Sequence, residues 1–339
     1  MTAVVKRGIV VGLGVMGSHH LRVLSALLGA EVAAVVDPDP DRVSSAQEAH
    51  PGLDGFSTLD AALEAVEADF ACLAVPVGAI PAAARLAFDA GLAVLAEKPL
   101  APSEDEARAL IADAHEGGLL LGVGHVERFN PAVIELKRRL DEGQLGRIYQ
   151  LHARRLSPFP ARAKPVGVAL DLATHDIDVM RYLTGAEVER VFAEAERRVN
   201  DDHEDLICAT LRFDSGVTGL LEVNWLTPTK VRELTVTGEG GMFVVNYHSQ
   251  ELSFYEDPRV EVKWDALAGV RGPDEGNMTR YAFERREPLV VEWEAFLRAL
   301  DEGSAPPVGG DDGLAALSTA LAIQRSGVEH TTVTPAYRA

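Results

Sequence analysis

The sequence predicts an α/β protein that combines a doubly wound parallel sheet with a second, α+β domain whose sheet is open-faced and mostly antiparallel. Three observations lead to this prediction. A glycine-rich turn follows the first apolar run, and short apolar runs alternate with helical patterns over roughly the first 125 residues. In the remainder, strand-like runs follow one another directly, which is typical of an antiparallel sheet.

The N-terminal part alternates strand-like and helical segments. Strands are predicted at 8–11, 31–36, 70–75, 93–96 and 119–123, and helices at 14–28, 40–50, 59–65, 80–90 and 103–116. The last of these helices begins at Ser103 and has Glu106 three residues later, which is the pattern of a capping box. Strands that alternate with helices form βαβ units, so this part predicts the parallel, doubly wound sheet.

The pattern changes after about His125, and we therefore predict two domains, residues 1–125 and residues 126–339. Helices are predicted at 131–140, 171–183, 286–300 and 313–327, and strands at 148–154, 188–198, 205–213, 217–225, 231–237, 241–246 and 250–255. Residues 268–277 are the most linker-like stretch. Consecutive strands of this kind predict a mostly antiparallel sheet with helices on one face.

The composition excludes several classes of protein. A formal net charge of −20 argues against nucleic acid and anionic membranes as partners. The chain has no run of about 18 apolar residues and no signal-peptide pattern, so we expect a cytoplasmic enzyme. Its two cysteines, Cys72 and Cys208, lie in separate apolar runs and suggest neither a disulfide framework nor a metal site.

The glycine-rich turn has the spacing of a dinucleotide-binding fingerprint. Its residues are Gly12, Leu13, Gly14, Val15, Met16 and Gly17, and they follow an apolar strand and open a helix. The first glycine permits the tight turn, the second lets the backbone approach a diphosphate, and the third lets the helix pack close to the strand. The prediction is a Rossmann domain that binds a diphosphate at the helix N-terminus through Gly12, Gly14, Val15, Met16 and Gly17.

Asp37 ends the second predicted strand, twenty residues beyond Gly17. Its carboxylate would accept hydrogen bonds from the adenosine ribose and repel a 2′-phosphate, so the expected cofactor is NAD rather than NADP. Arg42 is the nearby residue that could soften this preference. The alternative is a glycine-rich turn in an unrelated α/β domain, with Asp37 as a surface residue.

Two further segments carry candidate catalytic groups. Glu97-Lys98-Pro99 directly follows a predicted strand, where a doubly wound sheet binds ligands, although Lys98 could also be a surface lysine. On a helix, Asp171, His175, Asp178 and Tyr182 fall on one face, which suits proton transfer near neutral pH. That face could instead hold a divalent metal or simply face solvent.

Together these motifs resemble the Gfo/Idh/MocA oxidoreductase family, over nearly the whole chain. The resemblance implies that His175 removes the proton of an alcohol, that Lys98 hydrogen-bonds the same oxygen and that Asp171 assists. It also implies that Pro76, Glu97 and Lys98 lie beside the cofactor, with no catalytic metal, and that the second domain forms homodimers or homotetramers. The chain departs from the family at Ile80, where a histidine is common, which puts the cofactor contacts of that loop in doubt.

Within the family, residues 122–131 and 224–232 look most like those of UDP-N-acetylglucosamine 3-dehydrogenases. This finer resemblance implies oxidation of the C3 hydroxyl of a UDP-N-acetylhexosamine. The alternatives are another sugar or polyol dehydrogenase, such as one acting on inositol, and a non-catalytic NAD-binding sensor. The expected substrate-binding residues are Arg128, Asn130, Arg155, Arg162, Lys164, Asp178 and Lys230, although the cations could equally be ordinary surface charges.

Overall fold

The computed structural model describes residues 5–160, 166–258 and 276–338. These residues form two compact units. Unit 1 comprises Met1–Phe129 and Glu287–Ser318, and unit 2 comprises Asn130–Arg286 and Thr319–Ala339. This division differs from the predicted one at residue 125, because a segment near the C-terminus returns to the N-terminal unit. Within the described residues, no helix is long and apolar enough to cross a membrane.

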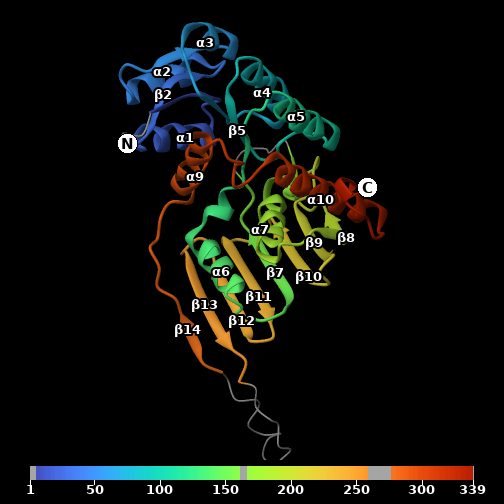
Figure 1. Ribbon diagram of the computed structural model, residues 1–339. Helices are drawn as coiled ribbons and strands as arrows, with labels where there is room; N and C mark the ends of the chain where they lie inside the picture. Colours follow the sequence, from blue (N-terminus) through green and yellow to red (C-terminus); the bar gives the residue numbers. More distant parts are fainter. Residues whose placement is uncertain (1–4, 161–165, 259–275, 339) are drawn as a thin grey trace, which may run out of the picture. The chain divides into compact units, whose positions relative to one another are not determined.

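Unit 1 contains a six-stranded parallel sheet (Figure 1). Its strands are β1 (Lys6–Val11), β2 (Ala30–Val36), β3 (Asp54–Phe56), β4 (Phe70–Leu73), β5 (Ala93–Glu97) and β6 (Leu121–Gly124). The order is β3-β2-β1-β4-β5-β6, and every pair is parallel. The predicted doubly wound sheet is therefore confirmed. The prediction missed β3, which has only three residues and contains the strand-disfavouring Asp and Gly.

The helices of unit 1 agree with the prediction to within a few residues. They are α1 (Val15–Ala26), α2 (Pro40–Ala49), α3 (Leu59–Ala65), α4 (Ile80–Asp89), α5 (Glu104–Glu116) and α9 (Pro288–Glu302), with short 3₁₀ turns η1 (Val77–Ala79) and η2 (Val126–Phe129). The capping box at α5 is confirmed, because Ser103 Oγ accepts a hydrogen bond from the Glu106 N–H and donates one to the Glu106 carboxylate.

Helix α9 belongs to unit 1 because of its apolar face. Leu289, Trp293, Phe296 and Leu297 are buried and share one core cluster with residues of α1 and of the parallel strands. Their spacing of four, three and one residues places them on one side of the helix. Trp293 also packs against Phe70 of β4, with ring centroids 5.3 Å apart. This buried face explains why residues 287–318 join the first unit.

Unit 2 is built on an eight-stranded sheet with the order β14-β13-β12-β11-β7-β10-β9-β8. Its strands are β7 (Ile148–Leu156), β8 (Val188–Glu196), β9 (Leu206–Phe213), β10 (Thr218–Asn224), β11 (Val231–Gly238), β12 (Gly241–Asn246), β13 (Glu251–Glu256) and β14 (Met278–Arg280). Only β7 and β10 pair in parallel, so the predicted mostly antiparallel sheet is confirmed. The short β14 was not predicted, and most of the predicted linker at 268–277 lies outside the described residues.

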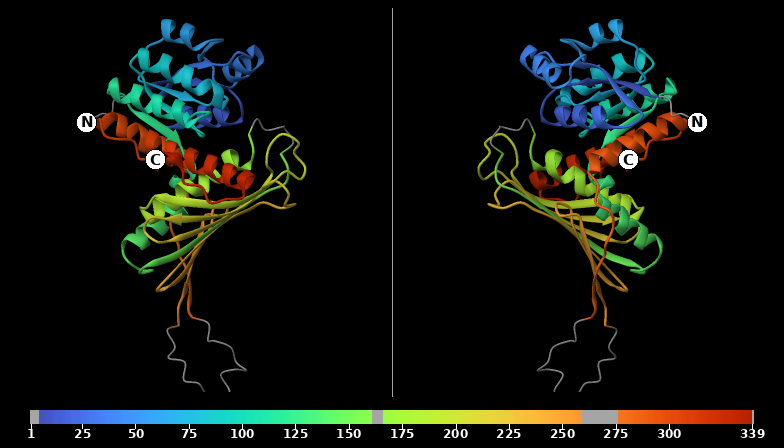
Figure 2. Two further views of the ribbon diagram at one scale, coloured as in Figure 1. Left: turned by 90° about the vertical axis from the view of Figure 1, so that its right-hand side faces the viewer. Right: turned by 90° about the vertical axis from the view of Figure 1, so that its left-hand side faces the viewer.

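The helices of unit 2 are α6 (Pro131–Asp141), α7 (Thr174–Thr184) and the C-terminal part of α10 (Gly310–Glu329). Figure 2 shows these helices against one face of the sheet, whereas no described helix lies on the opposite face. The strands alternate accordingly: in β8, Val191 and Ala193 are buried and Phe192 between them is exposed. The sheet is therefore open-faced, as predicted.

Candidate active site

The turn between β1 and α1 requires glycine at two positions. Gly12 has φ +89°, and a Cβ placed there would lie 2.4 Å from the Ala74 carbonyl oxygen. A Cβ on Gly17 would lie 1.7 Å from the Gly12 carbonyl oxygen. These contacts draw α1 close to the end of β1, as the fingerprint requires.

Gly14 differs from the other two glycines because it faces open space. A Cβ on this residue would meet no described protein atom within 4 Å. Gly14 is the N-cap of α1, so the N–H groups of the first turn and the helix dipole point toward the space beside it. The next residue, Val15, is 65% exposed despite its apolar side chain. An uncovered helix N-terminus beside an open glycine fits the diphosphate of NAD.

Asp37 is buried at the end of β2 and contacts the glycine turn directly. Its Oδ2 accepts a hydrogen bond from the Leu13 N–H at 2.7 Å, and its Oδ1 accepts one from the Asp39 N–H at 2.9 Å. Arg42 Nη1 lies 3.5 Å from Asp37 Oδ2. The predicted ribose-binding carboxylate is therefore held beside the turn, with the predicted modulating cation next to it.

The topology brings the remaining cofactor-side residues to the same sheet edge. Strands β1, β4 and β5 are parallel neighbours, so the segments after their last residues lie along one carboxyl edge. The glycine turn follows β1, the exposed Pro76 follows β4, and the half-buried Lys98 follows β5. Glu97 Oε2 accepts a hydrogen bond from the Lys98 N–H at 3.2 Å. Ile80, the point of departure from the family, is buried at the start of α4.

The predicted helix 171–183 is not uniform. Ala169–Ala173 forms a π-helical turn that continues into α7, and both Asp171 and His175 are half-buried. Single π-helical turns inside α-helices are frequent at functional sites. Asp178, in contrast, is fully buried. Its side chain lies in the interior of unit 2, and its contact with substrate stays a prediction.

Arg155 anchors α7 to the sheet. Its Nε lies 2.6 Å from Asp176 Oδ2 and its Nη2 lies 3.2 Å from Asp176 Oδ1, which makes a bidentate ion pair. The two side chains are 3% and 1% exposed. The Arg155 guanidinium also lies 5.2 Å from the ring centroid of Tyr247. Arg155 therefore has a structural role, since Asp176 compensates its charge inside the protein, and its predicted contact with substrate stays a prediction.

Removing the carboxylate of this pair is expected to destabilise unit 2 strongly. In Asp176→Ala, the buried Arg155 loses its counter-charge, and the free energy of unfolding should fall by about 3–5 kcal/mol. The matched control is Glu222→Ala, which breaks the neighbouring Arg154–Glu222 pair, whose side chains are 40% and 33% exposed. That change should cost about 1 kcal/mol or less. Urea unfolding of both variants measures the difference, and equal losses would show that the buried pair is not the anchor.

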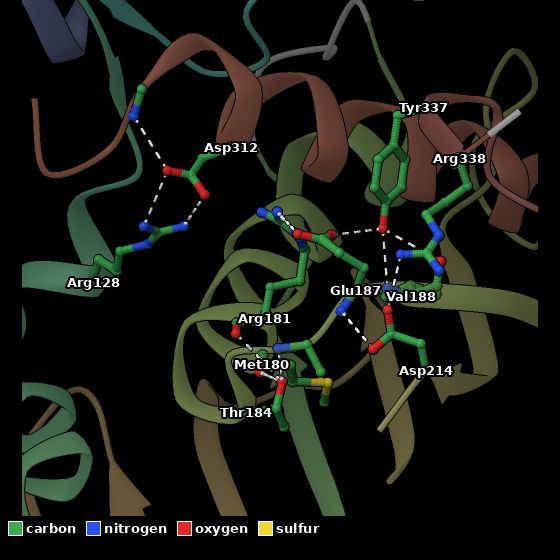
Figure 3. A network of polar contacts seen from close by, with 12 residues as sticks. Arg128, Met180, Arg181, Thr184, Glu187, Val188, Asp214, Asp312, Tyr337 and Arg338 are labelled. Atoms are coloured by element: carbon green, nitrogen blue, oxygen red, sulfur yellow. Dashed lines mark hydrogen bonds and ion pairs between the residues drawn. The ribbon is translucent and has the colours of Figure 1, made fainter. Parts of the chain in front are cut away.

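Further contacts fix both ends of the helix that carries Asp171 and His175. At its start, Glu204 Oε1 accepts hydrogen bonds from the Ala169 N–H at 3.1 Å and from Gln324 Nε2 at 2.9 Å. Near its end, Arg181 forms a bidentate pair with Glu187, which also accepts a hydrogen bond from the Tyr337 hydroxyl at 2.9 Å (Figure 3).

Tyr337 remains a donor in this network over a wide pH range. Burial and the adjacent Glu187 carboxylate raise the pKa of Tyr337 to about 12. Burial raises the pKa of Glu187, but Arg181, Tyr337 and Arg338 together outweigh burial, so the net shift of this pKa is downward. The hydroxyl therefore keeps its proton while Glu187 stays ionised. These contacts tie the C-terminal segment to the helix that carries His175.

Two other predicted substrate residues have structural partners. Arg128 Nη2 lies 2.9 Å from Asp312 Oδ1 (Figure 3). Arg128 Nη1 donates to the Pro307 carbonyl oxygen at 3.3 Å. Asn130 is the buried N-cap of α6: its Oδ1 accepts from the Ala132 N–H, and its Nδ2 donates to the Tyr247 carbonyl oxygen. The side chains of both residues therefore have internal partners, and their predicted contact with substrate stays a prediction.

The remaining predicted cations have different outcomes. Arg162 and Lys164 lie outside the described residues. Lys230 is exposed in the loop between β10 and β11, and its role stays a prediction. Within the described residues, no group of three or more potential metal ligands comes together, and both cysteines are free thiols.

One relevant residue was missed in the sequence. His20 of α1 is buried, and its Nε2 lies 2.9 Å from Glu97 Oε1, next to the candidate catalytic lysine. A signal was present, since His20 and the apolar Leu24 are four residues apart on the buried face of the helix.

Models of two families match the chain. Residues 6–125 match the oxidoreductase family with an NAD-binding Rossmann fold, and residues 133–244 match the GFO/IDH/MocA C-terminal domain. The chain belongs to the Gfo/Idh/MocA oxidoreductase family. It is accordingly an NAD-dependent oxidoreductase, and its relatives include dehydrogenases of nucleotide sugars and of inositols.

Similarity to individual proteins extends over the full length. UDP-N-acetylglucosamine 3-dehydrogenase of Acidithiobacillus ferrooxidans is 29% identical over 315 residues, which are 93% of this chain and 95% of that protein. A solved structure of that enzyme matches with a TM-score of 0.83 at 27% identity and covers 95% of this chain and 97% of its own. The scyllo-inositol 2-dehydrogenase (NAD(+)) of Bacillus subtilis is 26% identical over 330 residues, 94% of this chain and 92% of that protein.

Proposed function

We propose that the enzyme oxidises the C3 hydroxyl of a UDP-N-acetylhexosamine, such as UDP-N-acetylglucosamine, to the keto sugar. The observation that carries this proposal is the similarity, over nearly the whole chain, to a UDP-N-acetylglucosamine 3-dehydrogenase in both sequence and fold. Two local features support the chemistry: a half-buried lysine at the carboxyl edge of the parallel sheet, and a half-buried Asp171–His175 pair on an anchored helix.

Each residue has a proposed role in that reaction. NAD, when bound, supplies the hydride acceptor, so the alcohol carbon loses a hydride and the alcohol oxygen loses a proton. His175 accepts that proton, since imidazole exchanges protons near neutral pH. Lys98 donates a hydrogen bond to the same oxygen and stabilises the negative charge that develops on it. Asp171 orients His175, and the fixed position of α7 holds both groups.

On the cofactor side, the glycine turn would hold the diphosphate and Asp37 the adenosine ribose. The first turn of α1 offers backbone N–H groups to the phosphates, and the space beside Gly14 admits them. Asp37 is already oriented by the Leu13 and Asp39 N–H groups. Its carboxylate disfavours a 2′-phosphate by charge repulsion, in agreement with NAD.

An inositol-type polyol is the second candidate substrate. It is favoured by the match to scyllo-inositol 2-dehydrogenase and by the internal pairing of Arg128 and Arg155. That pairing leaves fewer of the predicted cations for a diphosphate.

A substrate panel distinguishes the two. We expect kcat/KM for UDP-N-acetylglucosamine to exceed that for myo- and scyllo-inositol by about 100-fold or more, because buried polar groups shaped for one substrate reject another that leaves them unpaired. Product formation should be followed with and without a 2-oxoacid, so that NADH reoxidised in place does not hide turnover. Efficient oxidation of inositol with no turnover of the nucleotide sugar would replace the first candidate by the second.

We also propose that the uncovered face of the unit 2 sheet forms a homodimer or homotetramer. Phe192 and Tyr255 are each 42% exposed on that face of the sheet, where a second subunit would bury them. A monomeric mass by light scattering would contradict this assembly.

A further inference from the structure

A buried chain of hydrogen bonds leads from the core of unit 1 to the backbone of Lys98. The Trp293 indole N–H donates to His20 Nδ1 at 2.9 Å. His20 Nε2 lies 2.9 Å from Glu97 Oε1, and Glu97 Oε2 accepts from the Lys98 N–H at 3.2 Å. Three elements distant in the sequence, α9, α1 and the end of β5, are thereby joined in one line.

The geometry sets the direction of each bond. The indole N–H can only donate, so His20 Nδ1 must offer a lone pair, and the ring proton lies on Nε2, facing the Glu97 carboxylate. Burial lowers the pKa of His20, but contacts with Cys72 and Glu97 outweigh burial, so the net shift is upward. This shift favours a proton on both nitrogens, but a doubly protonated ring could not accept the bond from Trp293. The hydrogen-bond geometry therefore corresponds to the neutral ring with its proton on Nε2. His20 is therefore held by its bond from Trp293 and in turn holds the Glu97 carboxylate.

Packing leaves this chain little freedom. Trp293 and His20 are fully buried, their rings meet edge to face at 5.6 Å, and the indole also packs against Phe70 and Phe296. On the strand next to β5, a Cβ on Gly124 would lie 3.3 Å from the Glu97 carboxyl carbon. The carboxylate of Glu97 is therefore confined on two sides.

We propose that Trp293 and His20 are positioning residues for catalysis: through Glu97 they fix the segment that carries Lys98. This inference rests on the proposed role of Lys98. Neither residue would touch substrate. Small displacements of a catalytic group lower the rate steeply, which explains why a buried polar chain is maintained where an apolar core would suffice.

The test combines kinetics with a spectroscopic signal from the cofactor-free enzyme. The chain has three tryptophans, so ¹⁵N-labelled indoles give few resonances, and Trp293→Phe assigns that of Trp293. We expect His20→Leu and Glu97→Gln both to shift this resonance. We expect Trp293→Phe and His20→Leu to lower kcat by about 10- to 100-fold with little change in substrate KM. His20→Gln should restore much of the activity, since its amide can accept from the indole and donate to Glu97.

Two control variants distinguish a positioning role from a general loss of stability and from a failure of the proposed function. Leu289→Ala removes apolar contacts of α9 in the same core cluster without touching a polar group, so it should lower the melting temperature but leave kcat unchanged. Wild-type kcat in Trp293→Phe and His20→Leu, beside an inactive Lys98→Met, would overturn this inference alone. Full activity of Lys98→Met would instead overturn the proposed function together with it.

Discussion

Replacing His175 by asparagine is expected to lower kcat by about 10²–10⁴-fold, because the enzyme loses the group that accepts the alcohol proton. Asparagine is of similar size and polarity, so the helix should stay intact. The Arg155–Asp176 and Arg181–Glu187 pairs hold that helix without any contribution from His175. Steady-state rates with saturating NAD and sugar measure the effect, and NAD binding should be unchanged.

The matched control is the same substitution at His330. This residue is exposed, and it has φ +51°, a conformation that asparagine tolerates better than most residues. His330→Asn should therefore keep wild-type kcat and stability. If His175→Asn turned over as fast as His330→Asn, His175 would not be the base.

The second large effect is expected at the glycine turn. Gly14→Ala should weaken NAD binding alone, whereas Gly17→Ala should also lower stability. In Gly14→Ala the added methyl meets no described protein atom, so the fold should keep its stability. The same methyl would occupy the space proposed for the cofactor diphosphate, so the Kd for NAD should rise by about 100-fold, or about 2.7 kcal/mol.

Gly17→Ala should lower both the stability of the fold and the affinity for NAD. Its methyl would collide with the Gly12 carbonyl oxygen, so α1 must move away from β1, at a cost of about 1–3 kcal/mol of stability. Calorimetric titration with NAD and thermal unfolding of the two variants separate the effects. Wild-type NAD affinity in Gly14→Ala would show that the open space beside this glycine is not the diphosphate site.

The glycine turn, Asp37 and the parallel sheet were predictable because they depend on short-range patterns. Gly12, Gly14 and Gly17 reflect backbone requirements that are met within one strand, turn and helix. The placement of Lys98 at the same sheet edge followed from its position directly after a strand, and the strand pairing agrees with it.

The internal partners of the predicted substrate cations are remote in the sequence, so the sequence did not reveal them. Nothing in the segment around Arg155 shows that Asp176 will neutralise it, and Arg128 meets its carboxylate 184 residues later. A cation in a sequence is therefore an ambiguous signal until its partner is known. The return of α9 to the first unit has the same cause. An apolar helix face does not show in the sequence which of the two units it will pack against, and here Trp293 and Phe296 pack into the core of unit 1.

The most direct test of the central claim is the mass of the sugar after incubation with enzyme and NAD, with and without a 2-oxoacid. We expect UDP-N-acetylglucosamine to lose two hydrogen atoms. When the sugar is labelled with deuterium at C3, the deuterium should be recovered in NADH or in the reduced oxoacid. The change should disappear in His175→Asn and Lys98→Met. An unaltered sugar mass with every UDP-sugar and polyol tested, under conditions where the enzyme binds NAD, would contradict the assignment as a sugar dehydrogenase.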